Sequence, residues 1–552
     1  MSGRARALIG GAVVVSVVAL AVIWVAFVGL GRSASSVALG APHFVDATVA
    51  AGIDHVYDGG STYSVGGGVA VFDCNGDGKP DMYLAGGSNP AALYRNDSTI
   101  GGALRFTALP DPATDLTGVI GAYALDIDGD GIVDLVVLRV GESVLLRGLG
   151  NCRFERANER WSFAGGTNAW TTAFSATWEG ANTLPTLAVG HYLGLDASGK
   201  PTTCADNALF RPAAAGTGYL PPIPLAPGYC TLSLLFSDWD RSGRRDLRAS
   251  NDRHYYVDGE EQLWRIAPGE PPRLYTAADG WAPMQIAGMG IASYDLSGDG
   301  YPDIFLTSQA DNKLQTLTTG PGQPTYRDIA LQRGVTAARP FTGGDVLPST
   351  AWHPEFQDVN NDGFIDLFVS KGNVSAQPDF ATKDPSDLFL GQPGGSFQEA
   401  ADAAGIVSYA RGRGAALADF NLDGMLDLVV VNYGQPVQLW QNMGFGDAAH
   451  PEPMGNWLAV KLAQPGPDRD AIGAWIEVRI GDATLRREVT VGGGHASGEL
   501  GWLHFGLGPT RDADVRIQWP DGTLGPWQHV TANQFVTVDR STGQVNPWRP
   551  AP

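Results

Sequence analysis

The sequence predicts an all-β fold: a seven-bladed β-propeller with calcium-binding hairpin loops, a small C-terminal β domain, and one N-terminal transmembrane helix. Three observations lead to this prediction. An acidic nine-residue pattern recurs six times, and short runs typical of strands flank each copy. Most copies are also spaced at the period of a propeller blade. The chain, at 552 residues, is long enough for this architecture.

The acidic pattern has the same design in every copy. Asp stands at position 1, Asp, Asn or Ser at position 3, Asp or Ser at position 5, Gly at position 6 and Asp at position 9. The copies are DCNGDGKPD (73–81), DIDGDGIVD (126–134), DWDRSGRRD (238–246), DLSGDGYPD (295–303), DVNNDGFID (358–366) and DFNLDGMLD (419–427).

This spacing of oxygen-bearing side chains suits calcium, which takes six to eight oxygen ligands. Gly at position 6 permits the tight curl that brings positions 1, 3 and 5 together. We expect about five to six Ca²⁺ ions, because one loop has weaker ligands. The predicted ligands are Asp73, Asn75, Asp77, Asp81, Asp126, Asp128, Asp130, Asp134, Asp238, Asp240, Ser242, Asp246, Asp295, Ser297, Asp299, Asp303, Asp358, Asn360, Asp362, Asp366, Asp419, Asn421, Asp423 and Asp427.

The flanking runs distinguish these loops from EF-hand loops, which close with Glu at position 12 between helices. Here runs such as GGVAVF and MYLAG, four to six residues long and rich in Val, Leu, Phe and Tyr, surround each copy. Each unit is therefore predicted to be a β-hairpin whose turn holds the metal. The alternative is that Asp, Asn and Gly merely form good turns. Three or four acids within nine positions would then repel one another without compensation.

The spacing of the copies indicates seven blades. Neighbouring copies start 53 to 63 residues apart, except for one gap of 112 residues between Asp126 and Asp238. Within that gap, segment 176–192 has the hydrophobic outline of the repeat without its acids, and we interpret it as a degenerate repeat. The last repeat lacks a fourth strand, and segment 44–53 is predicted to supply it and close the ring. An open β-solenoid is the alternative topology.

Five regions follow from these patterns. Residues 1–32 form a cytoplasmic N-terminus and signal anchor, 33–43 a linker, 44–450 the propeller, 455–541 a small β domain and 542–552 a disordered tail. Arg4 and Arg6 precede an uncharged apolar run at 7–30 that is long enough to span a bilayer. A cleaved signal peptide is the alternative, because 33–41 is rich in small residues. Both interpretations place the body outside the cytoplasm, membrane-anchored or secreted.

The acidity of the chain is mostly explained by the metal sites, and export would permit its four cysteines to form disulfides. The net charge is −21, and the six acidic copies contain nineteen Asp residues, so metal sites account for most of the acidity. No run of Lys and Arg indicates nucleic-acid binding. The four Cys allow three connectivities, and we expect Cys204 to pair with Cys230 across a Pro-rich insertion at 191–236. For Cys74 and Cys152 the simplest expectation is two free thiols.

The hairpin repeats resemble the FG-GAP/VCBS repeats of integrin α-subunit propellers. Segment 44–53, strands such as AALYRND (91–97) and the block 469–522 together resemble the cartilage acidic protein family, whose C-terminal part is the ASPIC/UnbV domain. The resemblance implies an extracellular, calcium-stabilised propeller used for adhesion or protein binding. The chain departs from the pattern at the degenerate repeat and at the copy 238–246, which carries Arg241, Arg244 and Arg245.

We therefore expect a non-enzymatic module that binds an unknown protein or polysaccharide, with the membrane contacted through the N-terminal helix. An exported hydrolase or oxidoreductase is the alternative, and His353 and His495 are the residues that could line its pocket. GGGH at 492–495 is interpreted as a tight turn rather than a phosphate-binding loop, because no helix follows. The UnbV resemblance also allows an accessory role in enediyne-like secondary metabolism.

Overall fold

The computed structural model describes residues 37–550 except 167, 215 and 253–256. The described residues from Ala38 onward form one compact unit. Within the described part the fold is all-β and propeller-like, with two single-turn α-helices, α3 (Ala330–Arg333) and α4 (Ala401–Ala404), and two 3₁₀ turns, η1 (Ser61–Tyr63) and η2 (Ala277–Asp279). None of these helices is long and apolar enough to cross a bilayer. The predicted signal anchor at 1–32 lies outside the described residues.

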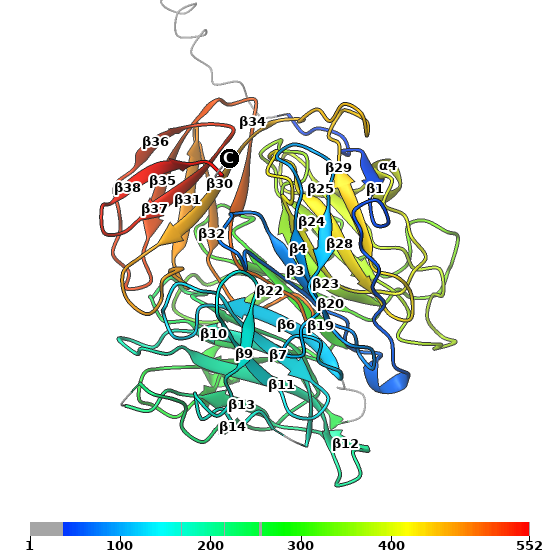
Figure 1. Ribbon diagram of the computed structural model, residues 1–552, viewed down its shortest axis with the longest axis vertical. Coiled ribbons are helices and arrows are strands. Elements are labelled where there is room, and N and C mark those ends of the chain that lie inside the picture. Colours follow the sequence, from blue (N-terminus) through cyan, green and yellow to red (C-terminus); the bar gives the residue numbers. More distant parts are fainter. Residues whose placement is uncertain (1–36, 167, 215, 253–256, 551–552) are drawn as a thin grey trace, which may run out of the picture. The chain divides into compact units, whose positions relative to one another are not determined.

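The first three repeats each form an antiparallel sheet in sequence order (Figure 1). The first sheet contains β2 (Val69–Phe72), β3 (Asp81–Leu84), β4 (Ala92–Asn96) and β5 (Phe106–Ala108). The second contains β6 (Val119–Leu125), β7 (Asp134–Arg139), β8 (Val144–Gly148) and β9 (Phe154–Arg156). The third contains β10 (Ala169–Thr177), β11 (Thr186–Leu195), β13 (Asn207–Phe210) and β14 (Ile223–Leu225), with β12 (Pro201–Cys204) paired to β11.

Four further sheets follow; the first three are in sequence order, and in the last one β1 takes the fourth place. They are β15 (Thr231–Ser237), β16 (Asp246–Asn251), β17 (Gln262–Arg265) and β18 (Arg273–Leu274); then β19 (Gly288–Tyr294), β20 (Asp303–Ser308), β21 (Lys313–Leu317) and β22 (Tyr326–Asp328). The next is β23 (Ala351–Gln357), β24 (Asp366–Lys371), β25 (Asp387–Gly391) and β26 (Phe397–Glu399). The last contains β27 (Gly412–Ala418), β28 (Asp427–Asn432), β29 (Gln438–Asn442) and β1 (Phe44–Asp46).

The first and last parts of the propeller-like region share one sheet. β1 (dark blue) pairs antiparallel with β29 (yellow), with Phe44 opposite Asn442 (Figure 1). The first strand of each sheet, here called an inner strand, contacts the inner strand of the next sheet, and β27 contacts β2. The inner strands are β2, β6, β10, β15, β19, β23 and β27. They are almost wholly buried; β2 and β6 have near-continuous apolar sequences, whereas β10 and β15 also bury Ser and Thr.

The third sheet explains the long gap between the second and third acidic copies. Segment 176–192, predicted as a degenerate repeat, lies in the β10–β11 hairpin. The segment 191–236, expected as an insertion, instead supplies β13 and β14, the third and fourth strands of this sheet. The expected disulfide between Cys204 and Cys230 is present.

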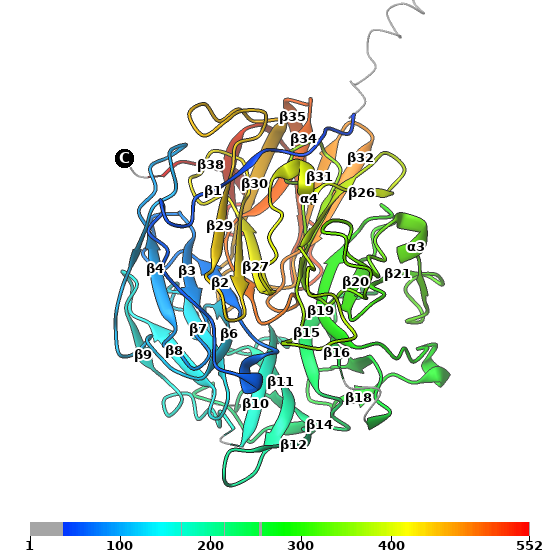
Figure 2. The same cartoon turned by 90° about the vertical axis from the view of Figure 1, so that its right-hand side faces the viewer.

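The C-terminal region forms two four-stranded sheets (Figure 2). One contains β34 (Leu503–Gly508), β30 (Asn456–Ala463), β37 (Gln534–Asp539) and β38 (Gln544–Trp548); the other contains β32 (Ala483–Glu488), β31 (Trp475–Ile480), β35 (Asp512–Gln518) and β36 (Gln528–Thr531). The prediction of a disordered tail at 542–552 is wrong for β38, which pairs with β37. Trp548 holds this strand in place by packing against Trp502 and Phe535.

A glycine-rich segment of the C-terminal region, residues 490–500, lies among the inner strands. Its short strand β33 (Gly498–Glu499) pairs with β2. The remaining contacts reach every other inner strand. They are Ala122 N to Ala496 O (3.3 Å), Ala176 N to Val491 O (3.2 Å), Gly493 N to Leu234 O (2.7 Å), Gly494 N to Ile291 O (2.7 Å), His495 N to His353 Nδ1 (3.0 Å) and Leu417 N to Glu499 Oε1 (3.2 Å). We call residues 490–500 the inserted segment.

Candidate metal-binding loops

All six acidic copies are hairpin turns between the first and second strands of their sheets, as predicted. In each, the Asp at position 9 is the first residue of the second strand, as Asp81 is in β3 and Asp366 in β24. Position 1 follows the last residue of the inner strand directly. The six loops therefore lie at the same end of their inner strands.

One hydrogen bond recurs in every loop and sets its curl. The amide of Gly at position 6 donates to Oδ2 of Asp at position 1, for example from Gly363 to Asp358 (2.8 Å) and from Gly424 to Asp419 (2.7 Å). The same bond forms in the loops that begin at Asp73, Asp126, Asp238 and Asp295. These glycines have positive φ, which a side chain would strain. The framework holds the position 1 carboxylate toward the loop interior.

The Asp at position 9 ties the loop to the third strand, a role that the sequence did not reveal. In Asp81, Oδ2 accepts from Cys74 N (2.7 Å) and Oδ1 accepts from Asn96 N (2.7 Å) in β4. Asp134, Asp366 and Asp427 repeat both bonds with their own loops. Asp at this position is therefore structural whether or not it also binds a metal ion.

The carboxylates at position 9 are buried in all six loops, as are five of the six at position 1, and burial disfavours their charge. It raises the pKa of Asp81 and of Asp134 to about 8. Burial, and then the neighbouring carboxylates, hold the pKa of Asp358 and Asp419 well above the usual range. A cation bound in such a cluster would offset this unfavourable burial of charge.

Unpartnered oxygens support the fit of these residues to a cation. Four buried side-chain oxygens at position 1 or 3 accept no hydrogen bond, although buried acceptors are nearly always paired. They are Asp128 Oδ1, Asp238 Oδ1, Asp295 Oδ1 and Asn421 Oδ1. Carboxylate and amide oxygens are the ligands that calcium prefers. The carboxylates of Asp126, Asp128 and Asp130 already converge, with one oxygen of each within 4.8 Å of the others.

Protein cations compete for four of the loops. Arg147 pairs with Asp128 (2.9 Å) and Asp130, and Lys79 pairs with Asp77 (3.3 Å). In the loop 238–246, Arg244 pairs with Asp246 (2.9 Å). Arg486, from β32, pairs with Asp295 (3.0 Å). A guanidinium beside these acids already supplies part of the charge that calcium would bring.

The loops 358–366 and 419–427 differ, because none of the described Lys or Arg residues forms an ion pair with their acids. Their position 3 side chains are also buried, unlike those of the other four loops: Asn360 is 1% exposed and Asn421 is 0% exposed. These two loops therefore have the strongest electrostatic demand for a metal ion.

The C-terminal region covers the loops. His504 bonds Asn361 Oδ1 through Nε2 (2.6 Å), and Trp502 Nε1 donates to Gly78 O (3.1 Å). Arg469 Nε donates to Gly129 O (2.6 Å), and Arg245 Nη1 donates to Pro520 O (2.8 Å). Gly424 packs closely against the Trp457 ring, because a methyl group added at Gly424 would lie only 1.9 Å from that ring. With the Arg486–Asp295 pair, every loop touches this region.

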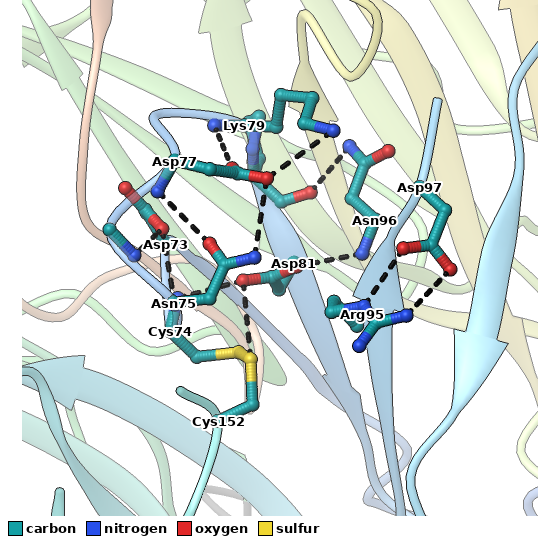
Figure 3. Close-up of a disulfide and its surroundings, with 12 residues drawn as sticks. Asp73, Cys74, Asn75, Asp77, Lys79, Asp81, Arg95, Asn96, Asp97 and Cys152 are labelled. Carbon is teal, nitrogen blue, oxygen red and sulfur yellow. Dashed lines mark hydrogen bonds and ion pairs between the residues drawn. A yellow bond between two sulfur atoms is a disulfide. The ribbon is translucent and has the colours of Figure 1, made fainter. Parts of the chain in front are cut away.

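A disulfide joins the first loop to the second sheet. Figure 3 shows Cys74, at position 2 of the loop 73–81, bonded to Cys152 beside Asp81. The expectation of two free thiols is wrong. The Cys74 side chain does point away from the loop interior, but Cys152, in the turn between β8 and β9, lies close enough to meet it: the Cα atoms are 4.6 Å apart. No signal in the sequence joins these two positions.

We expect this disulfide to contribute more stability than the Cys204–Cys230 bond. The first closes 78 residues and the second 26. In the chain-entropy description the longer loop gives about 1 kcal/mol more. Urea unfolding of the double variants Cys74→Ser/Cys152→Ser and Cys204→Ser/Cys230→Ser measures the difference. Equal losses, or a larger loss from the second pair, would show that chain entropy does not govern these bonds.

His353 and His495 do come together, but in the buried interior. The His495 amide donates to His353 Nδ1, and the His495 ring packs on Trp352 with 5.0 Å between centroids. Burial lowers the pKa of His495 to about 3, so its ring is neutral at physiological pH. GGGH is part of the inserted segment, not an isolated tight turn.

Two families match the chain. The FG-GAP-like repeat family matches residues 73–137 and 358–430, which contain four of the six loops. The ASPIC and UnbV family matches residues 464–545. The chain is thus a protein with FG-GAP-like repeats and a C-terminal ASPIC and UnbV domain.

Among individual proteins it is similar to cartilage acidic protein 1. It is 29% identical to the Mus musculus protein over 208 residues, covering 34% of this chain and 27% of that protein. It is 34% identical to the Xenopus tropicalis protein over 250 residues, covering 43% and 34% respectively. The matched part thus spans about a third or less of these relatives.

Similarity to solved structures is more distant. BBS1N in its complex with ARL6DN has a TM-score of 0.41 at 12% identity, covering 73% of this chain and 98% of that chain. AofleA from Arthrobotrys oligospora has a TM-score of 0.33 at 12% identity, covering 62% and 86%. Likeness at these scores supports no functional inference.

Proposed function

We propose that the chain is a non-catalytic, calcium-binding interaction module that works outside the cytoplasm. Its scaffold is a closed seven-bladed propeller, supported by the unbroken series of inner-strand contacts and by the pairing of β1 with β29. The observation that carries the calcium proposal is the shared loop framework, together with the unpartnered ligand oxygen that four of the loops bury. Two disulfides favour export, and the similarity to cartilage acidic protein 1 agrees with it.

Calcium has a structural role in this proposal. An ion in a loop offsets the repulsion among buried acids and stabilises the folded state by mass action. Because the C-terminal region contacts every loop, the same ions also stabilise its attachment. We place the tightest ions in the loops 358–366 and 419–427, and the weakest in 238–246, where Arg244 already pairs with Asp246.

The partner is a protein or polysaccharide, reached from the side that the C-terminal region leaves free. Anchoring through residues 1–32 would hold the module at the membrane surface, and cleavage there would release it.

Substitution of a loop ligand tests the calcium assignment. We expect Asp419→Ala to remove one calcium ion per chain and to lower the melting temperature more in the presence of calcium than in its absence. Calorimetric titration gives the stoichiometry. The control is Asp311→Ala, an exposed acid outside the loops, which leaves both quantities unchanged. An unchanged stoichiometry in Asp419→Ala would contradict the assignment of this loop.

A further inference from the structure

Three ionisable side chains meet in the interior of the sheet β23–β26. Lys371 is the last residue of β24, Asp387 is the first residue of β25, and Asp384 lies just before β25. Val369 pairs with Asp387, and side chains alternate along a strand, so Lys371 and Asp387 lie on the same face of the sheet. Lys371 Nζ lies 2.9 Å from Asp387 Oδ1 and 3.2 Å from Asp384 Oδ1. We call these three residues the buried triad.

The buried triad is shielded from water. The exposed fraction of the side chain is 0% for Lys371, 1% for Asp384 and 2% for Asp387. Lysine is almost never fully buried without a charged partner, and here two carboxyl groups share one ammonium group. If all three were charged, the triad would carry a net negative charge in the interior, which is costly to bury. One of the two carboxyl groups is therefore protonated.

The hydrogen bonds identify Asp387 as the protonated group. Asp384 accepts from Ser349 Oγ (2.8 Å) and Thr350 N (2.7 Å) as well as from Lys371, and these donors stabilise its charged form. Asp387 Oδ1 accepts from Lys371, whereas its buried Oδ2 has no partner among the described residues. Burial raises the pKa of both carboxyl groups, that of Asp387 to about 7. Burial lowers the pKa of Lys371, but the attraction of the two carboxyl groups outweighs this effect and keeps it an ammonium group.

An ammonium group, a carboxylate and a carboxylic acid in contact are the components of an amide condensation. Asp384 accepts one proton from Lys371 and frees the Nζ lone pair, which attacks Cγ of Asp387. A C–N bond forms and the C–O bond to the Asp387 hydroxyl group breaks. The hydroxyl group leaves as water with a second proton from Nζ, while Asp384 keeps the first proton, so atoms, electrons and charge balance.

The surroundings favour this reaction in two ways. The reacting groups are held in contact, and intramolecular reactions of well-oriented groups reach effective concentrations of about 10⁵ M or more. The amide and the protonated Asp384 are both neutral, so the reaction leaves no charge of the triad buried in the interior.

We propose that Lys371 and Asp387 form an intramolecular isopeptide bond, with Asp384 as the catalytic residue. The bond links the second and third strands of their sheet and closes the segment 372–386. Arg413, in β27 of the next sheet, donates to two carbonyl oxygens of this segment, Asn373 O (3.1 Å) and Val374 O (2.6 Å). The bond therefore fixes a segment against which an inner strand packs. The reaction takes place within one chain and does not depend on calcium.

Tryptic digestion of the unfolded whole chain, followed by mass spectrometry, tests for the bond. Trypsin cuts after Lys and Arg, but not after a lysine whose Nζ is part of an amide. Without the bond, this region yields the separate peptides 334–371, 372–383 and 384–411. With it, we expect one product that joins 334–383 to 384–411 and weighs one water molecule less than the two together. Recovery of the three separate peptides alone, or fragmentation that places the bond at Asp384, would overturn the proposal.

The role of Asp384 is tested by Asp384→Asn, which keeps both reacting groups and removes the base. The linked fraction is followed with time after cell-free synthesis. We expect the variant to link about a hundredfold more slowly than the unmodified chain, the lower range for general acid–base catalysis. Equal rates would overturn the catalytic role of Asp384. The digest of the unmodified chain decides the existence of the bond even if this variant does not fold.

Lys313 and Asp328 provide the matched control. They form an ion pair at 3.3 Å in the preceding sheet, but their side chains are 23% and 40% exposed. The same digest should show normal cleavage after Lys313, and Asp328→Ala should leave the bond between Lys371 and Asp387 unchanged. A linked product at Lys313 would show that burial does not select the reacting pair and would contradict the mechanism.

Discussion

Removal of calcium is expected to lower the melting temperature of this protein by ten degrees or more. At free calcium one hundred times the dissociation constant, each site contributes about 2.7 kcal/mol to the free energy of unfolding. Four occupied loops would therefore contribute about 11 kcal/mol, a large share of the stability of a folded protein. The loss of unfolding free energy should be larger than for a protein with a single metal site, because the C-terminal region contacts all six loops and its attachment would weaken as well.

Differential scanning calorimetry with excess chelator measures this effect, and restored calcium should reverse it. Magnesium at the same concentration is the control, since it is smaller and keeps its own water ligands. Restoration by calcium but not by magnesium is the expected pattern. A melting temperature that does not respond to the chelator would mean that the loops hold their shape without metal.

The second large effect is expected at the inner strands. A methyl group at Gly68 would lie 1.7 Å from Ala496 O, and one at Gly121 would lie 2.1 Å from the same atom. Neither glycine has positive φ, so Gly68→Ala and Gly121→Ala test the steric contact alone. We expect each to lower the free energy of unfolding by about 3 kcal/mol, the upper range for overpacking, because the backbone of the inserted segment must move. Urea unfolding in saturating calcium gives the value.

Gly322→Ala is the matched control for these variants. Gly322 also lacks positive φ, and a methyl group there meets nothing within 4 Å. Its effect should stay within about 1 kcal/mol. Limited proteolysis should cut the inserted segment faster in Gly68→Ala than in Gly322→Ala. Equal stability and equal cleavage would show that the inserted segment is not held by the inner strands.

Structural features were predictable where the residues that determine them lie within one segment of the chain. The hairpins at the six loops follow from acids and glycine at fixed positions between short apolar runs. The pairing of segment 44–53 with the last repeat followed because that repeat lacked a fourth strand, and β1 does pair with β29. Blade spacing likewise located the β10–β11 hairpin without any metal ligands.

Features that depend on contacts between distant segments could not be predicted from the sequence. Cys74 and Cys152 meet only because neighbouring sheets bring a loop and a turn together. β38 exists because Trp548 finds Trp502 and Phe535, 13 to 46 residues earlier in the chain. The segment GGGH at 492–495 was predicted to be an ordinary turn, because no neighbouring residue indicates that Gly492 and Gly494 pack against inner strands. Arg486 reaches Asp295 across the two regions for the same reason.

The most direct test of this account is the calcium content of the purified chain. The protein is equilibrated by dialysis with millimolar calcium, and bound metal is counted by elemental analysis against a dialysis blank. We predict several ions per chain, with those that depend on Asp358 and Asp419 the last to leave as chelator is added. Bound calcium no higher than the blank would contradict the account.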